Sequence, residues 1–140
     1  IDPSAENIRF VFERSDGTLA EENIVVLPAL FDIESPADDI LLTRDDELDI
    51  RWRAEDSDDK LHIRIDGMCL DPHEDVVDIN QGSYPLPVYA LHWSPFSEEG
   101  ESCNVTVTLE RRLEGSIDPI FEEGSIYGAQ RQTRTVTIQR

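Results

Sequence analysis

Long hydrophobic runs and positive charge are both scarce in this sequence. No apolar run approaches the roughly 18 residues of a membrane-spanning helix, so we expect no membrane insertion of this segment. The chain has 12 Lys and Arg side chains against 31 Asp and Glu, which gives a formal net charge of −19. Such a field repels phosphate backbones and excludes nucleic acid as an expected partner. Acidity of this degree also occurs in salt-adapted proteins, where it serves solubility.

The motifs of common catalytic sites are missing as well. There is no G-x-S-x-G nucleophile elbow, no G-x-x-x-x-G-K-[ST] phosphate loop and no G-x-G-x-x-G dinucleotide fingerprint. Acidic side chains are so frequent that some carboxylate pair always falls near the spacing of a glycosidase, so such pairs carry no signal. We therefore expect no enzymatic activity and no resident cofactor, calcium excepted.

A helical period does not persist for three turns anywhere, and the dominant period is two. In residues 47–54, Leu48, Ile50 and Trp52 alternate with charged side chains. The same alternation recurs in segments 60–67, 103–112 and 133–140. This pattern is typical of half-buried strands in antiparallel sheets. Weaker strands are predicted at 8–14, 23–34, 75–79 and 87–93. The fold class is therefore all-β, with about eight strands at the spacing of a sandwich.

Residues 30–52, LFDIESPADDILLTRDDELDIRW, resemble the opening of immunoglobulin-like and fibronectin-III-like modules of bacterial periplasmic and surface proteins, lipoproteins included. The shared pattern is a short strand that ends in Ser35-Pro36, a loop, and a strand of the form L-x-I-x-W. The resemblance covers residues 30–139 and implies an immunoglobulin-like antiparallel β-sandwich of about eight or nine strands. Residues 1–29 lie outside it and are expected to add a strand or hairpin to a single domain, 1–140.

Modules of this family mostly bind, space or scaffold, so the resemblance implies a non-catalytic binding or structural role. The chain begins at IDPSAENIRF without an initiator Met, a basic region or an apolar signal core. We expect a mature or trimmed segment of an exported bacterial protein, periplasmic or held at the cell surface, whose signal or anchor segment is absent from this chain.

The cysteines Cys69 and Cys103 are the minimum for one disulfide. Cys69 follows one predicted strand and Cys103 begins another. If these strands are antiparallel neighbours in the sandwich, the end of one lies beside the start of the other, which suits a bridge. We predict a Cys69–Cys103 disulfide and hence an oxidising compartment.

Two acidic segments are candidate metal sites. In residues 66–78, DGMCLDPHEDVVD, zinc is not expected because C-x-x-C and H-x-x-x-H spacings are missing, although His73 and its acidic neighbours remain a minor cation candidate. Calcium is the better hypothesis, because Asp56, Asp58 and Asp59 crowd one turn and calcium accepts oxygens from irregular loops. The alternative is a solvated turn, since Asp favours turns in any case.

Aromatic and apolar side chains in loops are candidate binding residues. The loop 114–130 contains Ile120, Phe121 and Tyr127, and either projects toward a protein partner or packs back on the body as a twisted hairpin. Trp93 flanks a Pro-rich loop and is either a stacking platform for a glycan or part of the core. The alternative to an unspecified binding role is thus a calcium- or carbohydrate-binding β-sandwich module.

Overall fold

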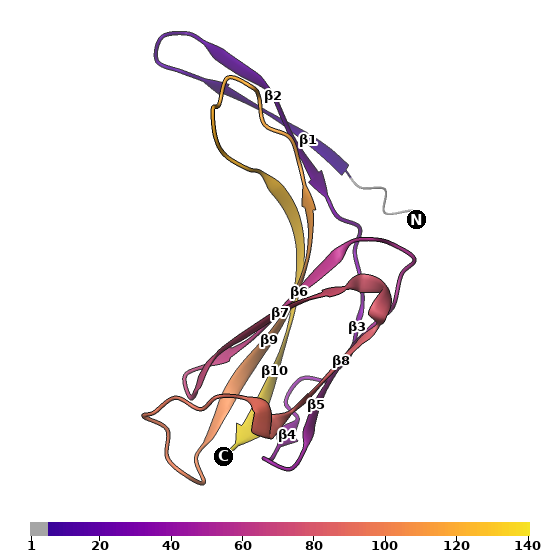
Figure 1. Cartoon of the computed structure of the whole chain (residues 1–140), viewed down its shortest axis with the longest axis vertical. Helices are drawn as coiled ribbons and strands as arrows, with labels where there is room; N and C mark the ends of the chain where they lie inside the picture. The colour runs from indigo at the N-terminus through magenta and orange to yellow at the C-terminus, as the bar shows by residue number, and fades with distance from the viewer. Residues whose placement is uncertain (1–5) are drawn as a thin grey trace. The chain divides into compact units, whose positions relative to one another are not determined.

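The computed structural model of the chain describes residues 6–140. These residues form ten strands and two short 3-10 helices, so the predicted all-β class is confirmed (Figure 1). The first five residues of the predicted N-terminal segment 1–29 lie outside the described residues. No helix within residues 6–140 is long and apolar enough to cross a membrane. The chain divides into two compact units: unit 1 holds Ile1–Leu30 and Arg111–Gln130, and unit 2 holds Phe31–Glu110 and Arg131–Arg140.

Unit 1 is built on an antiparallel hairpin of β1 (Glu6–Glu13) and β2 (Leu19–Leu27) (Figure 1). Its turn contains Gly17, whose φ of 83° favours glycine. Phe10 pairs with Asn23 but Phe12 pairs with Ala20, so β2 contains one residue more than β1 between these pairs. The extra residue makes a β-bulge on β2, opposite Val11 of β1.

The long strands β9 (Ser102–Glu114) and β10 (Tyr127–Gln139) are sheet neighbours and contribute residues to both units. In unit 1, Ile24 of β2 forms an antiparallel bridge with Ser116, with two backbone hydrogen bonds of 2.9 Å. A Cβ atom on Gly115 would collide with the carbonyl oxygen of Ile24. Glycine is therefore required at 115, because the backbone of β2 lies directly against it.

Unit 2 contains two sheets. The larger has the order β4–β10–β9–β6–β7, with β4 at Leu41–Leu42, β6 at Lys60–Gly67 and β7 at Leu70–Asp78. The smaller has the order β3–β5–β8, with β3 at Ile33–Ser35, β5 at Glu47–Trp52 and β8 at Ser83–Pro87. β4 joins β10 in parallel, whereas the pairs β6–β7, β3–β5 and β5–β8 are antiparallel.

Both sheets of unit 2 contribute to one hydrophobic core. The alternating side chains that predict strands β5, β6, β9 and β10 are the ones that are buried. The largest fully buried ones include Trp52, Leu48, Ile50, Leu61, Ile63, Ile65, Leu109 and Ile138. The Trp52 indole Nε1 also donates a 2.7 Å hydrogen bond to the Ile79 carbonyl, so its one polar atom is satisfied inside the core.

The predicted disulfide is present. Cys69, between β6 and β7, is bonded to Cys103 at the start of β9, with the Cα atoms 6.2 Å apart. Cys69 is buried in the core of unit 2 and Cys103 is packed against it. The bridge therefore ties the β6–β7 turn to the neighbouring strand.

The predicted strand at 87–93 is wrong. The strand in this region is β8, which ends at Pro87, and the chain continues as a 3-10 helix, η2 (Val88–Ala90). Another 3-10 helix, η1 (Ile79–Gln81), precedes β8. Pro85 and Pro87 have no amide hydrogen, but β8 is the edge strand of its sheet, where a missing donor is tolerated. The Pro-rich segment that the sequence predicts as a loop beside Trp93 therefore contains the strand.

Candidate functional site

The three aspartates of the calcium hypothesis lie in the turn between β5 and β6. Asp56 and Asp58 are exposed and Asp59 is partly buried. The amide of Asp59 donates to the Ser57 hydroxyl at 3.1 Å, and its carbonyl accepts from the Ile79 amide at 3.0 Å. Within residues 6–140, no three His, Cys, Asp or Glu side chains gather closely enough to hold a metal ion. The structure therefore does not bring these three carboxylates together as a ligand set.

His73 is engaged by a tyrosine. Its Nε2 atom lies 2.9 Å from the hydroxyl of Tyr84, and that hydroxyl donates to Asp75 at 2.9 Å. Burial, followed by the hydrogen bond to Asp75, raises the pKa of Tyr84 to about 12. Because His73 and Asp75 belong to β7 and Tyr84 to β8, this network links edge strands of the two sheets of unit 2.

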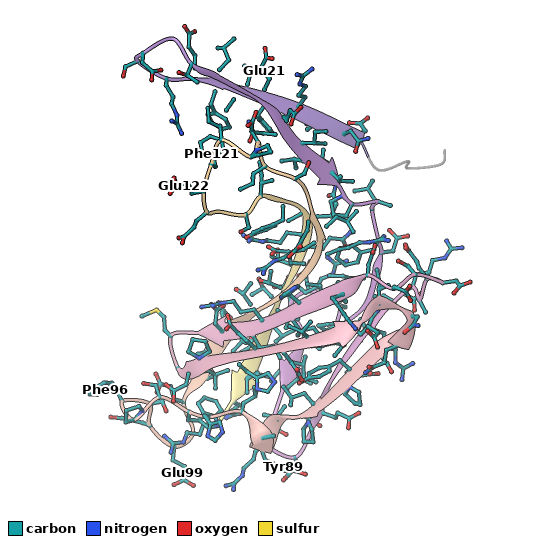
Figure 2. The ribbon with its side chains drawn as sticks, turned by 45° about the horizontal axis from the view of Figure 1, so that its top comes forward. Glu21, Tyr89, Phe96, Glu99, Phe121 and Glu122 are labelled. Carbon is teal, nitrogen blue, oxygen red and sulfur yellow. A yellow bond between two sulfur atoms is a disulfide. The ribbon has the colours of Figure 1, made fainter. Side chains whose placement is uncertain are left out.

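The loop candidates of unit 1 contact the β1–β2 hairpin. Phe121 lies at the tip of the loop, beside the hairpin (Figure 2). Its ring meets that of Phe12 edge to face at 6.0 Å between centroids, and the Arg14 Cζ atom lies 5.8 Å from the centroid of the Phe121 ring. Ile120 is partly buried, whereas Tyr127 is 50% exposed. The Arg112 Cζ atom lies over the Tyr127 ring, 5.0 Å from its centroid. The tip of the loop thus packs within its own unit.

A polar junction fixes that loop to β2. The Asp118 carboxylate accepts hydrogen bonds from the bulge amides of Glu21 and Glu22, at 2.8 and 3.0 Å, and from the Ile120 amide at 2.9 Å. These amides, Ile120 first, lower the pKa of Asp118. The Asp118 amide donates at 3.0 Å to Asn23, a side chain that is only 1% exposed.

Trp93 borders a cleft in unit 2 that contains two arginines. One cavity of about 430 Å³ is lined by Thr43, Arg44, Asp45, Glu99, Gln139 and Arg140. A smaller one of about 150 Å³ is lined by Arg44, Tyr89, Trp93 and Arg140. Because Arg44 and Arg140 line both cavities, we treat them as one site and name it the Arg44–Arg140 cleft.

The turn that carries Arg44 is held by Asp46. The Asp46 carboxylate accepts from the Thr43 amide at 2.7 Å and from the Thr43 hydroxyl at 3.0 Å. The backbone hydrogen bond and then the hydroxyl lower the pKa of Asp46. The Asp46 carbonyl also accepts from the Val88 amide at 3.0 Å. This last bond ties the turn to η2, the helix that presents Tyr89.

Arg140 fixes the opposite wall. Its guanidinium donates to the Ser97 hydroxyl at 3.0 Å and to the Ser97 carbonyl, while its own amide donates to Glu101 at 2.9 Å. Its Cζ atom lies 5.8 Å from the centroid of the Trp93 ring. The cation therefore covers one face of Trp93 and joins the 94–101 loop to the end of β10.

Arg44 has a charge that the surrounding structure leaves unpaired. Its side chain is exposed and forms no hydrogen bond or ion pair with any residue in the described part of the chain. Arg51 and Arg64 of the same unit, in contrast, each pair with an aspartate. In a chain with a net charge of −19, a free guanidinium at a cavity is a local attractor for anions.

The cleft offers three kinds of contact. Arg44 and Arg140 are donors, Asp45 and Glu99 are acceptors, and Tyr89, 69% exposed, presents an aromatic ring. In Figure 2, Tyr89 and Glu99 project into solvent from the same end of unit 2. Among the lining side chains, the one hydroxyl besides that of Tyr89 belongs to Thr43, and it donates a hydrogen bond to Asp46. The cleft can therefore bind an anionic group through its arginines and contact the rest of a ligand through the acceptors and the ring.

Sequence reasoning identified Trp93 and missed its neighbours. Arg44 and Arg140 come from parts of the chain distant from Trp93, so no local motif joins them to it, although Tyr89 lies close to Trp93 in the sequence. The one sequence feature that could have indicated the site is the scarcity of positive charge. In so acidic a chain, each arginine without a nearby acidic partner is a candidate for binding an anion. No protein-family model matches the chain, and no curated protein is similar to it in sequence.

Proposed function

We propose that this chain is a non-catalytic binding module of an exported bacterial protein and that it binds an acidic saccharide in the Arg44–Arg140 cleft. One observation carries the proposal: an unpaired Arg44, a second arginine and an exposed tyrosine surround two adjoining cavities. We also infer an immunoglobulin-like sandwich for unit 2, which is supported by its two sheets on one shared core.

The charged groups favour a ligand with a carboxylate. A guanidinium offers parallel N–H donors that match both oxygens of a carboxylate, and such charge-assisted bonds are stronger than neutral ones. Arg140 is already oriented by Ser97, so little side-chain entropy is lost when it binds. Arg44, which has no ion-pair partner in the described part of the chain, would form a new ion pair with the carboxylate of the ligand.

The remaining groups favour a sugar ring. Tyr89 presents a flat aromatic surface on which the C–H face of a sugar can stack. Asp45 and Glu99 accept hydrogen bonds from hydroxyl groups, which a simple carboxylate does not have. The larger cavity, about 430 Å³, falls in the range of roughly 300–1,000 Å³ typical of small-molecule sites.

The net charge limits the ligand further. At −19, the chain repels polyanions over the Debye length, so a saccharide with one carboxylate is favoured over a highly charged polymer. Export is supported by the Cys69–Cys103 disulfide, because disulfides persist in oxidising compartments. A periplasmic or cell-surface location follows from the same proposal.

Titration calorimetry with glucuronic acid, glucose and acetate tests the proposal. Glucuronic acid is expected to bind at least about tenfold more tightly than glucose, the ratio for losing one charge-assisted pair. It should also bind more tightly than acetate, which offers no ring. Arg44→Ala should remove the preference for glucuronic acid, while Arg53→Ala, an equally unpaired exposed arginine of unit 2, should leave it unchanged.

Two tyrosine variants test whether the ligand binds in the Arg44–Arg140 cleft or at the loop of unit 1. Tyr89→Ala should weaken binding, and Tyr127→Ala, which alters another exposed tyrosine, should not. Absence of binding heat with glucuronic acid, glucose and acetate alike would contradict the proposal. If binding persists in Arg44→Ala and Tyr89→Ala but is lost in Tyr127→Ala, the binding site lies at the loop 114–130 and not in the cleft.

A further inference from the structure

The strand β1 has one free edge and carries apolar side chains. It pairs with β2 in a two-stranded sheet, and all eight of its residues are exposed. Phe10 is 41% exposed, Val11 55% and Phe12 51%. A long apolar edge strand is a template for pairing with another chain.

The usual protections of an edge strand are missing from β1. Its sequence, ENIRFVFE, contains no Pro and no Lys, and the β-bulge of the hairpin lies on β2. The other edge of β2 is occupied at Ile24, which bridges Ser116. Within the described part of unit 1, β1 is thus the edge of the hairpin that remains open.

The sequence of β1 is complementary to itself in one antiparallel register. When Val11 of one copy lies opposite Val11 of a second copy, Arg9 faces Glu13 and Phe10 faces Phe12 on both sides of the two-fold axis. Opposite charges and aromatic pairs directly across from each other stabilise antiparallel strands.

The neighbouring registers lack this match. A shift of two residues in one direction places Arg9 opposite Val11 and Asn7 opposite Glu13, and in the other direction it places Val11 opposite Glu13. Only the Val11-centred register joins both charged pairs and both aromatic pairs. A two-fold interface is isologous, so a self-complementary strand is the feature it requires.

From this match we propose that a second copy of this chain docks on the β1 edge. Two β1 strands pair in the Val11-centred register and join the two hairpins into one four-stranded sheet, β2–β1–β1–β2. Backbone hydrogen bonds supply the shared ladder. The two Arg9–Glu13 pairs set the register, and Val11 meets its counterpart at the axis.

The side-chain arrangement of the hairpin fits this dimer. Arg9, Val11 and Glu13 alternate along β1 and so share one face, while Phe10 and Phe12 lie on the other. Arg9 Nε donates to the Glu21 carbonyl of β2 at 2.7 Å, and the two terminal nitrogens of the guanidinium remain available to Glu13 of a second copy. Phe12 is held against Phe121, so the aromatic face is ordered before pairing.

Sedimentation velocity of the full chain tests the proposal. At an ionic strength of about 0.15 M, where the Debye length is about 8 Å, repulsion between the two acidic bodies is screened and contact pairs persist. A monomer–dimer equilibrium is expected, and Val11→Lys should weaken it at least about tenfold by opposing two ammonium groups at the axis. Val76→Lys is the matched control, because Val76 is 51% exposed on β7, another edge strand.

A charge exchange tests the register. Arg9→Glu alone and Glu13→Arg alone each oppose like charges twice and should weaken the dimer, whereas the double variant restores opposite pairs and should recover it. Val11→Cys should form an interchain disulfide under oxidising conditions, because directly opposed Cα atoms of antiparallel strands lie about 4.5–5.5 Å apart, within the range of a disulfide, and Val76→Cys should not.

Three results would overturn the proposal. The first is a wild-type chain that stays monomeric at every concentration tested. The second is a dimer that Val11→Lys and Val76→Lys affect equally, since the interface would then lie elsewhere. The third is failure of the double charge variant to recover association while circular dichroism shows a folded chain.

Discussion

Removal of the Cys69–Cys103 disulfide is expected to destabilise unit 2 by about 4 kcal/mol, a magnitude that follows from the length of the closed loop. The bonded residues are 34 positions apart. Loop-closure entropy for about 34 residues corresponds to about 3.8 kcal/mol at 25 °C, because the cross-link restricts the unfolded chain. Small domains have roughly 5–15 kcal/mol of stability in total, so unit 2 should lose a large part of it.

Tryptophan fluorescence isolates the unit in question. The chain has two tryptophans, Trp52 and Trp93, and both belong to unit 2, as the disulfide does. Urea unfolding of the oxidised wild type is compared with the Cys69→Ala/Cys103→Ala variant. The variant should unfold at lower urea with a steeper dependence on urea, because its unfolded state is more expanded.

Reduction of the wild type separates the effect of the disulfide from the effect of replacing the two cysteine side chains by alanine. Dithiothreitol should destabilise the wild type by a similar amount and leave the double variant unchanged. A difference below about 1 kcal/mol between oxidised and reduced wild type would refute the loop-entropy reasoning. Two free thiols in native protein, measured by mass spectrometry, would refute the bridge and remove the support for export.

Two further predictions concern unit 1 and are read from the hydrogen exchange of the Ile24 amide, which donates to Ser116. The Asp118 carboxyl has its pKa lowered by the Ile120 amide and those of the bulge, so its contribution is fully present above the unfolded pKa of about 4 and is lost as pH falls through the folded value. Asp118→Asn should therefore speed exchange of the Ile24 amide at neutral pH and have little effect at a pH well below the folded pKa of Asp118. An equal effect at the two pH values would show that the charge of Asp118 does not stabilise unit 1. Gly115→Ala should destabilise unit 1 by about 1–3 kcal/mol, because its Cβ collides with the Ile24 carbonyl, and unchanged protection would contradict the close approach.

Strands were predictable from sequence where one face is buried and the other wet. In β5, Leu48, Ile50 and Trp52 are all nearly inaccessible, so their alternation with charged residues reports the fold directly. β8 gave no such signal, because an edge strand with two prolines has an irregular pattern and few obligatory donors. Periodicity therefore identifies the central strands better than the edges.

The candidate site was less predictable, for a geometric reason. The Cys69–Cys103 bridge follows from strand order, since strand ends in an antiparallel sheet meet. The cleft joins Arg44 of one turn, Tyr89 of a 3-10 helix and Arg140 at the end of β10, and nothing in their spacing shows that they meet. The prediction from sequence therefore identified Trp93, one side of the cleft, but not the two arginines that give the cleft its positive charge.

The shared strands β9 and β10 have a consequence for the gene. Each supplies residues to both units, and the chain passes from one unit to the other after positions 30, 110 and 130. Unit 1 is therefore encoded by two separate segments, and no single cut in the gene releases either unit whole. We expect that recombination can exchange this region between proteins only as an entire block. Expression of residues 31–140 alone should yield a chain that carries segment 111–130 of unit 1 without the β1–β2 hairpin that completes this unit.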